Sequence, residues 1–178
     1  MLIANHAAAF HRSCRSSMRG LTLIELMVTV AVLAVGLSLA APSFTQQIAN
    51  YRLRTASESI INGLNYARAE AVRRNSPVSF ALDAGGSGWA VVQVSPATAL
   101  QSSSNGDSPN IITTSSTASR AVTFTATGFV DNSGVRMSRI DLSSSAANTD
   151  ARRIDIFGGG LIRVCDPAVA TAGDPRRC

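Results

Sequence analysis

Apolar residues fill one unbroken stretch near the amino terminus and then recur at regular intervals along the chain. Residues 21–41 (LTLIELMVTVAVLAVGLSLAA) contain a single charged residue, Glu25. A helix needs about 20 mostly apolar residues to cross a bilayer, so this segment is predicted to span a membrane. The preceding residues RSCRSSMRG carry only positive charge, which predicts that this flank stays on the cytoplasmic side.

Residues 42–76 predict an amphipathic continuation of the same helix. Apolar residues three or four positions apart form one stripe, at Leu53, Ala56, Ile60, Leu64, Ala67 and Ala71. Pro42 is positioned to kink the helix just after the apolar stretch. Cationic side chains favour the carboxyl end of a helix, where Arg73 and Arg74 lie, and the following Asn75-Ser76-Pro77 predicts that the helix stops there.

From residue 78 the apolar period changes to two, which predicts an antiparallel β-rich head over residues 77–178. The expected strands cover residues 78–82, 89–94, 121–125, 137–142, 154–157 and 161–164, with Phe129-Val130 after a turn at Gly128. Residues 95–119, rich in Ser and Thr, predict a loop with one short strand at 111–114, and 143–150 predict a second loop. Gly158-Gly159-Gly160 predicts a hairpin turn rather than a phosphate-binding loop, because no helix follows it. The expected fold class is α+β, with a long amino-terminal helix packed on a small antiparallel sheet.

The composition argues against an enzyme and against a strongly basic protein. The net charge is +5, but three arginines lie in the first 20 residues, and the remainder carries 13 arginines against 11 acids. Both histidines, His6 and His11, also lie in that short segment. The body therefore lacks histidine-based triads and most zinc sites, and we expect neither a metal nor a cofactor. Asp141, Asp150 and Asp155 are scattered and predicted to be solvated.

Residues 19–26 (RGLTLIEL), followed by the apolar run, resemble the cleavage and methylation site of type IV prepilins and type II secretion pseudopilins. The resemblance implies that residues 1–20 are a leader, that a prepilin peptidase cuts after Gly20, and that the new amine on Leu21 is methylated. Leu21 stands where the family more often has Phe. Met18 is an alternative start that would give the same mature chain.

Glu25 lies inside the predicted span, where a carboxylate is costly and marks a functional candidate. The resemblance implies that Glu25 neutralises the amino terminus of a neighbouring subunit during filament assembly. The alternative is a carboxylate that reaches the headgroup region. An ordinary secretory signal cut near Ala40-Ala41 is a further alternative, which Pro42 disfavours.

Two later segments narrow the resemblance to the GspH/FimT branch of minor pseudopilins and minor pilins. They are NYRLRTA at 50–56 and LNYARAEAVRR at 64–74, and FTATG at 124–128 resembles a strand and turn of that head. The implied function is a structural subunit that initiates or caps a type II secretion pseudopilus or a type IV pilus. Its implied partners are other pilins and the inner-membrane assembly platform, with the chain crossing the bacterial inner membrane once and its head in the periplasm.

Removal of the leader would also remove Cys14 and leave Cys165 and Cys178. Exported bacterial domains form disulfides, and a terminal disulfide loop occurs in FimT-like members, so we expect this pair to be joined. Two unpaired thiols are the alternative.

The resemblance also suggests a second function, DNA uptake. Some FimT proteins bind DNA through a Gly-Arg-x-Arg motif on the last hairpin, which corresponds to Gly160-Leu161-Ile162-Arg163 here. Arg163 keeps one basic position, while Leu161 replaces the other. The candidate DNA-binding residues are Arg163, Arg176, Arg177, Arg152 and Arg153, and nearby aspartates weaken their combined field.

Overall fold

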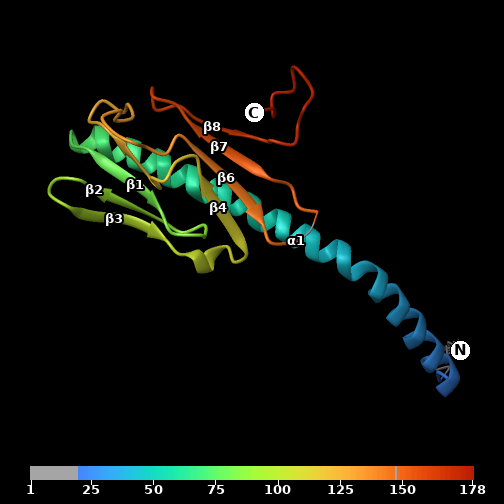
Figure 1. Cartoon of the computed structure of the whole chain (residues 1–178). Coiled ribbons are helices and arrows are strands. Elements are labelled where there is room, and N and C mark those ends of the chain that lie inside the picture. Colours follow the sequence, from blue (N-terminus) through green and yellow to red (C-terminus); the bar gives the residue numbers. More distant parts are fainter. Residues whose placement is uncertain (1–19, 147) are drawn as a thin grey trace, which may run out of the picture. The chain divides into compact units, whose positions relative to one another are not determined.

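The computed structural model describes residues 20–178 apart from residue 147, so residues 1–19 of the predicted leader, with Cys14 and both histidines, lie outside the described residues. The chain forms two compact units, divided between Ala40 and Ala41. Helix α1 (Leu23–Arg74) is followed by eight strands, all of which belong to the second unit (Figure 1).

The apolar stripe predicted along the helix is the helical side of the core. Its six residues are at most 1% exposed: Leu53, Ala56, Ile60, Leu64, Ala67 and Ala71. The helix ends at Arg74, as predicted, because Asn75 turns into the left-handed region with φ of 49°. The N–H of Ser76 then donates to the carbonyl of Ala71 at 3.2 Å, which satisfies an acceptor at the helix end.

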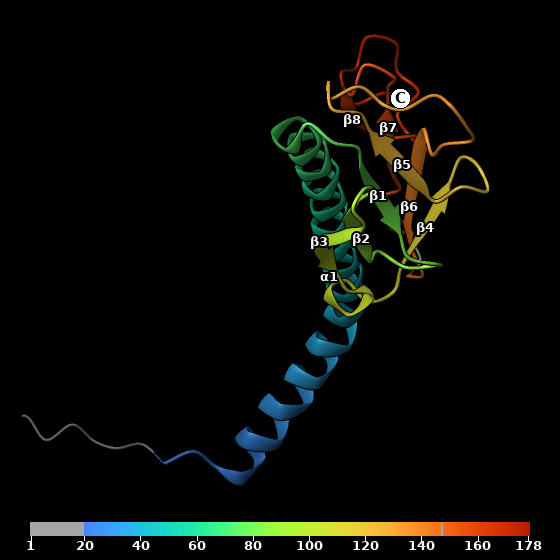
Figure 2. The same ribbon diagram turned by 90° about the vertical axis from the view of Figure 1, so that its left-hand side faces the viewer.

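The head contains two four-stranded sheets, where a single sheet was expected. One has the order β3-β2-β1-β5, with β1 (Val78–Leu82), β2 (Trp89–Gln93), β3 (Thr98–Ser103) and β5 (Ala121–Phe124). The other has the order β4-β6-β7-β8, with β4 (Ile111–Ser115), β6 (Arg139–Ser144), β7 (Arg152–Ile156) and β8 (Ile162–Cys165). All strand pairs are antiparallel, and both sheets lie on the same side of the head's helix (Figure 2). The predicted α+β class is confirmed.

Residues 95–119, predicted as a loop with one short strand at 111–114, hold a further strand and a 3-10 turn that the sequence did not predict. The segment contains strand β3, a 3-10 turn at Asn105–Asp107 and strand β4. Strand β3 lies at the edge of its sheet, beside β2, and none of its residues is fully buried. An edge strand of this kind needs no alternation of apolar and polar residues, so the sequence pattern did not reveal it. Strand β4 was predicted one residue too short.

Smaller differences concern strand ends. Residues Phe129-Val130 form only an isolated bridge with Phe124, and Met137 is buried just before β6 begins. Strand β6 extends into the predicted polar loop, and β7 begins two residues earlier than expected. Hydrogen bonds to neighbouring strands set these ends, and the apolar pattern does not contain that information.

A close approach fixes the helix on the first sheet. A Cβ atom at Gly63 would lie 2.8 Å from the ring of Phe80 and 2.9 Å from that of Trp89, so only glycine fits there. The two rings stack with centroids 5.7 Å apart. The indole N–H of Trp89 donates to Ser59 Oγ on the helix at 3.0 Å.

Candidate functional site

The predicted processing site immediately precedes the first turn of α1. Thr22 caps the helix, since the backbone N–H of Glu25 donates to Thr22 Oγ1 at 3.3 Å. A threonine cap followed three residues later by glutamate is the capping-box pattern, and an acid in the first turn is favourable for the helix dipole. Glu25 is exposed and lies four residues after Leu21. Cleavage after Gly20 would turn the backbone nitrogen of Leu21 into a free amine.

The segment that follows exposes its apolar side chains to the surroundings. Every large apolar residue between Leu21 and Leu37 exposes 54–78% of its surface. Taken alone, no helix in the described part of the chain is long and apolar enough to count as a membrane span. The helical segments Leu23–Ser38 and Ser43–Arg74 reach the length and apolar content of a span only when taken together.

At the other end of the chain, a disulfide closes the carboxyl-terminal loop. It joins Cys165, at the end of β8, to Cys178, the pair expected from the sequence. The N–H of Asp166 donates to the carbonyl of Arg176 at 2.7 Å, which ties the two arms of the loop together. Arg163 on β8 donates from Nη2 to the carbonyl of Arg177 at 2.6 Å.

The five arginines considered for DNA binding do not form one free basic face. Besides Arg163, Arg176 pairs with Asp174 at 2.8 Å and Arg153 pairs with Asp141 at 2.6 Å. The guanidinium of Arg176 lowers the pKa of Asp174 to about 2. The ion pair with Arg153 shows that Asp141 is paired, which corrects the expectation that this carboxylate is only solvated.

Arg152 and Arg177 differ from those three arginines. Within the residues that the structure describes, no hydrogen bond or ion pair is found for either guanidinium. Three of the five candidate cations are thus engaged inside the head, an arrangement that does not favour the DNA-binding alternative. Among the described residues, no group of three or more potential metal ligands comes together.

Arg68 carries a role that its sequence position alone did not reveal. Arg68 is half-buried on α1, where its Nε donates to the carbonyl of Gly128 at 3.1 Å and its Nη1 donates to that of Gly160 at 3.0 Å. The Arg68 guanidinium thereby links the helix by hydrogen bonds to the turn after β5 and to the β7–β8 turn. Gly128 and Gly160 adopt φ of 80° and 79°, respectively, in the left-handed region that favours glycine. The only sequence signal was an arginine beside the apolar stripe.

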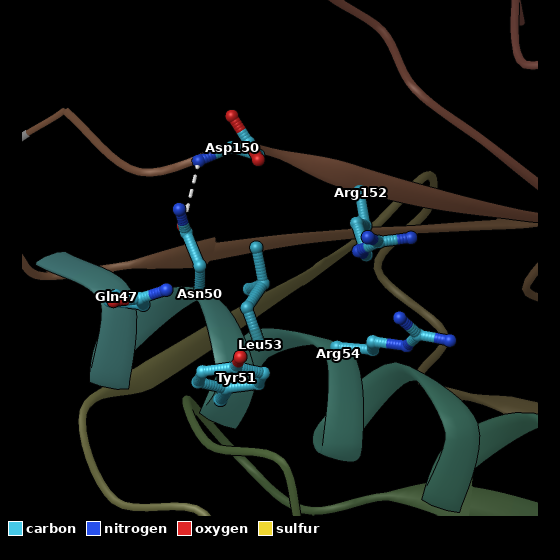
Figure 3. Close-up of a pocket in the computed structure, with 7 residues that line it drawn as sticks. All are labelled: Gln47, Asn50, Tyr51, Leu53, Arg54, Asp150 and Arg152. Atoms are coloured by element: carbon cyan, nitrogen blue, oxygen red, sulfur yellow. Dashed lines mark hydrogen bonds between the residues drawn. The ribbon is translucent and has the colours of Figure 1, made fainter.

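A groove separates the beginning of the head's helix from the start of β7 (Figure 3). Its volume is about 260 Å³, and its lining comprises Gln47, Asn50, Tyr51, Leu53, Arg54, Asp150 and Arg152. Asn50 Oδ1 accepts a hydrogen bond from the backbone N–H of Asp150 at 3.2 Å and so ties one end of the groove together. Arg152 was a candidate for DNA binding from its sequence position, and no local pattern in the sequence indicated this groove.

Comparison with known families decides where this architecture belongs. The family described as type II transport protein GspH matches residues 56–160, more than half of the chain. This chain belongs to the GspH family. The prokaryotic N-terminal methylation motif matches residues 15–41, which include Gly20, Leu21 and Glu25. The predicted family is therefore confirmed, and Arg68, Gly128 and Gly160 all lie inside the GspH match.

One similar protein agrees with this assignment, and one solved structure shares the fold. The type II secretion system protein H of Xanthomonas campestris is 35% identical over 69 residues, which cover 39% of this chain and 41% of that protein. The chain thus matches less than half of that relative's length. The crystal structure of the type IV minor pilin FimU of Pseudomonas aeruginosa shares the fold, with a TM-score of 0.57 at 24% identity, covering 72% of this chain and 97% of that one.

Proposed function

We propose that this GspH-family chain is a minor pseudopilin, a non-enzymatic structural subunit of a type II secretion pseudopilus. The observation that carries the proposal is the order of two features on one chain. A methylation motif at residues 15–41 precedes a GspH match at residues 56–160. We favour type II secretion over a type IV pilus because the family and the Xanthomonas relative both bear that name.

The proposed anchor is the apolar segment 21–41, which would cross the bacterial inner membrane once. The positive flank before it favours a cytoplasmic amino terminus and a periplasmic head. A disulfide between Cys165 and Cys178 agrees with an oxidising compartment for the head. Residues 42–76 would continue the helix into the head.

Processing would convert the precursor into a subunit that can assemble. A prepilin peptidase would remove residues 1–20 and methylate Leu21. In the low dielectric of the membrane, the new amine and the Glu25 carboxylate of a neighbouring subunit attract strongly. The partners would be the peptidase, other pseudopilins and the inner-membrane assembly platform, and the subunit would help to initiate or cap the filament.

Mass spectrometry of the membrane-extracted protein tests this proposal. The mature chain should begin at Leu21 and carry one additional methyl group. In a strain without prepilin peptidase, the leader should remain attached. A mature amino terminus near Pro42 in the wild-type strain would identify an ordinary secretory signal and contradict the proposal.

A further inference from the structure

The groove between the helix and β7 has the form of a small polar binding site with an apolar floor. Leu53 lines it and is completely buried, while Tyr51 is 63% exposed at its rim. Figure 3 shows the side chains of Arg54 and Arg152 on the same side of the groove. In the same view the Asp150 carboxylate is directed away from the helix.

The charges in and beside the groove decide what kind of ligand it suits. Arg54 already pairs with Glu58 at 2.9 Å, and both side chains are well exposed. Arg152 has no such partner in the described part of the chain. Asp150 is the acid that lines the groove, and Glu58 lies beside it through its pair with Arg54. Two arginines against Glu58 and Asp150 give no net charge, so a polyanion such as DNA gains little there.

A neighbouring hollow borders the other side of Arg152. Its lining includes Asp166 and Arg176. Arg176 is held by Asp174, and Asp166 is not in ion-pair contact with Arg152. Among the described residues, Arg152 is therefore the cation lining the groove for whose guanidinium no hydrogen bond or ion pair is found, whereas Arg54 uses its Nε on Glu58.

We infer that this groove binds a single carboxylate side chain, an Asp or Glu presented by a neighbouring pilin-like subunit in the filament. A guanidinium offers two parallel N–H donors that match the two oxygens of a carboxylate. Arg152 provides that fork, Arg54 adds a second cation, and the Gln47 amide adds a further donor at the rim. A monoanion suits a site whose surroundings are neutral overall. The inference rests on the proposed function, since it deepens how the subunit would assemble.

Site-specific crosslinking of the full chain in its host cell tests the inference. Tyr51 is replaced by the photoreactive residue p-benzoyl-phenylalanine, and crosslinked peptides are identified by mass spectrometry. We expect a peptide from another pilin-like subunit that contains an Asp or Glu. Combining the probe with Arg152→Gln should lower the crosslink yield at least fivefold.

A matched control is Arg139→Gln on β6. Arg139 is also partly exposed, but it does not line the groove, and its partner Asp141 keeps an ion pair with Arg153. This variant should leave the crosslink unchanged. Replacing the identified acid by its amide should reduce the yield as much as Arg152→Gln, and the two changes together should add nothing further. The charge-reversed pair, Arg152→Glu with the partner acid changed to Arg, should restore crosslinking.

A second probe separates failure of this inference from failure of the proposed function. Val28 lies in the apolar segment and is 54% exposed, so Val28→p-benzoyl-phenylalanine should crosslink to other subunits if the chain enters a filament. Crosslinks from Val28 without any from Tyr51 would overturn the carboxylate site alone. A Tyr51 crosslink to phospholipid, or one that is insensitive to Arg152→Gln, would overturn it as well. Absence of subunit crosslinks from both positions would contradict the filament role itself.

Discussion

The contact between Arg68 and Gly160 joins helix α1, the β7–β8 turn and the turn at Gly128. A Cβ at Gly160 would approach the Gly128 carbonyl oxygen closer than any real contact and would lie 2.9 Å from Arg68 Nε. Its positive φ adds strain for any other residue. Position 160 therefore requires glycine, because the β7–β8 turn approaches both Arg68 on α1 and the Gly128 turn.

We predict that Gly160→Ala destabilises the head by about 2 kcal/mol or more, through strain and displacement of Arg68. Urea unfolding of the full chain in detergent, followed by the fluorescence of Trp89, measures this, because Trp89 is the single tryptophan and is 4% exposed. Gly159→Ala is the control, since nothing lies within 4 Å of a Cβ there. Equal stability of the two variants would contradict the role of this contact.

Glu70 provides a pH-dependent contribution at the same end of the helix. It is 8% exposed and accepts hydrogen bonds from Arg73 at 2.8 and 2.7 Å and from Arg74 at 2.6 Å. Hydrogen bonds from Arg73, and then from Arg74, lower the pKa of Glu70 from 4.5 to about 2. Because the folded-state pKa is depressed, the stabilisation is present above pH 4.5 and is lost as the pH falls toward 2.

We therefore predict that Glu70→Gln lowers the free energy of unfolding by about 1–2 kcal/mol at neutral pH. The difference from wild type should shrink between pH 4.5 and pH 2. Glu58→Gln is the control, because its ion pair with Arg54 is exposed and should contribute about 0.5 kcal/mol or less. Urea titrations at several pH values measure both, and a Glu70 effect that persists unchanged at pH 2 would argue against this account.

At the scale of elements, the disulfide and β8 act together on the carboxyl-terminal loop. The bridged cysteines are 13 residues apart, and Arg163 on β8 donates to the carbonyls of the returning arm. Cross-linking a loop of this size stabilises by up to about 3 kcal/mol in the chain-entropy model. Arg163 thus has a structural role in holding this loop.

Accordingly, Cys178→Ser should lower stability by up to about 3 kcal/mol and speed tryptic cleavage after Arg176 and Arg177. A reducing agent should produce the same change in the wild type and no further change in the variant. The Trp89 unfolding midpoint and a digestion time course measure the two effects. Reductant-insensitive cleavage of the wild type would contradict a stabilising disulfide.

At the scale of the whole molecule, the proposed assembly depends on Glu25. We predict that Glu25→Gln leaves the chain in the membrane fraction, because removing a charge makes insertion easier. Incorporation into sheared pseudopili should fall at least fivefold, because the neighbouring amine loses its counter-charge. Ser38→Ala is the control, since Ser38 Oγ donates to the Val35 carbonyl of its own helix, at 2.8 Å. Normal incorporation of Glu25→Gln would refute the pairing.

The sequence by itself determined the features that depend on local periodicity and short motifs. The helical stripe from Leu53 to Ala71, the helix end at Asn75 and most strands of the head follow from spacings of three to four and of two. The motif around Gly20 and the GspH-like segments also led to the family that the comparison confirms. These signals need only neighbours within a few residues.

Only the tertiary structure decided the contacts between distant segments. Arg68 meets Gly128 and Gly160 across 60 and 92 residues, respectively, and strand β3 is stabilised by pairing with β2 rather than by an apolar pattern. Nearby aspartates were expected to weaken the field of Arg163, Arg153 and Arg176, but the sequence did not identify the partner that each finds in the fold. Arg152 lines a groove with residues about 100 positions away. The physical reason is that hydrogen bonds and ion pairs depend on which side chains folding brings together, and local composition does not specify those partners.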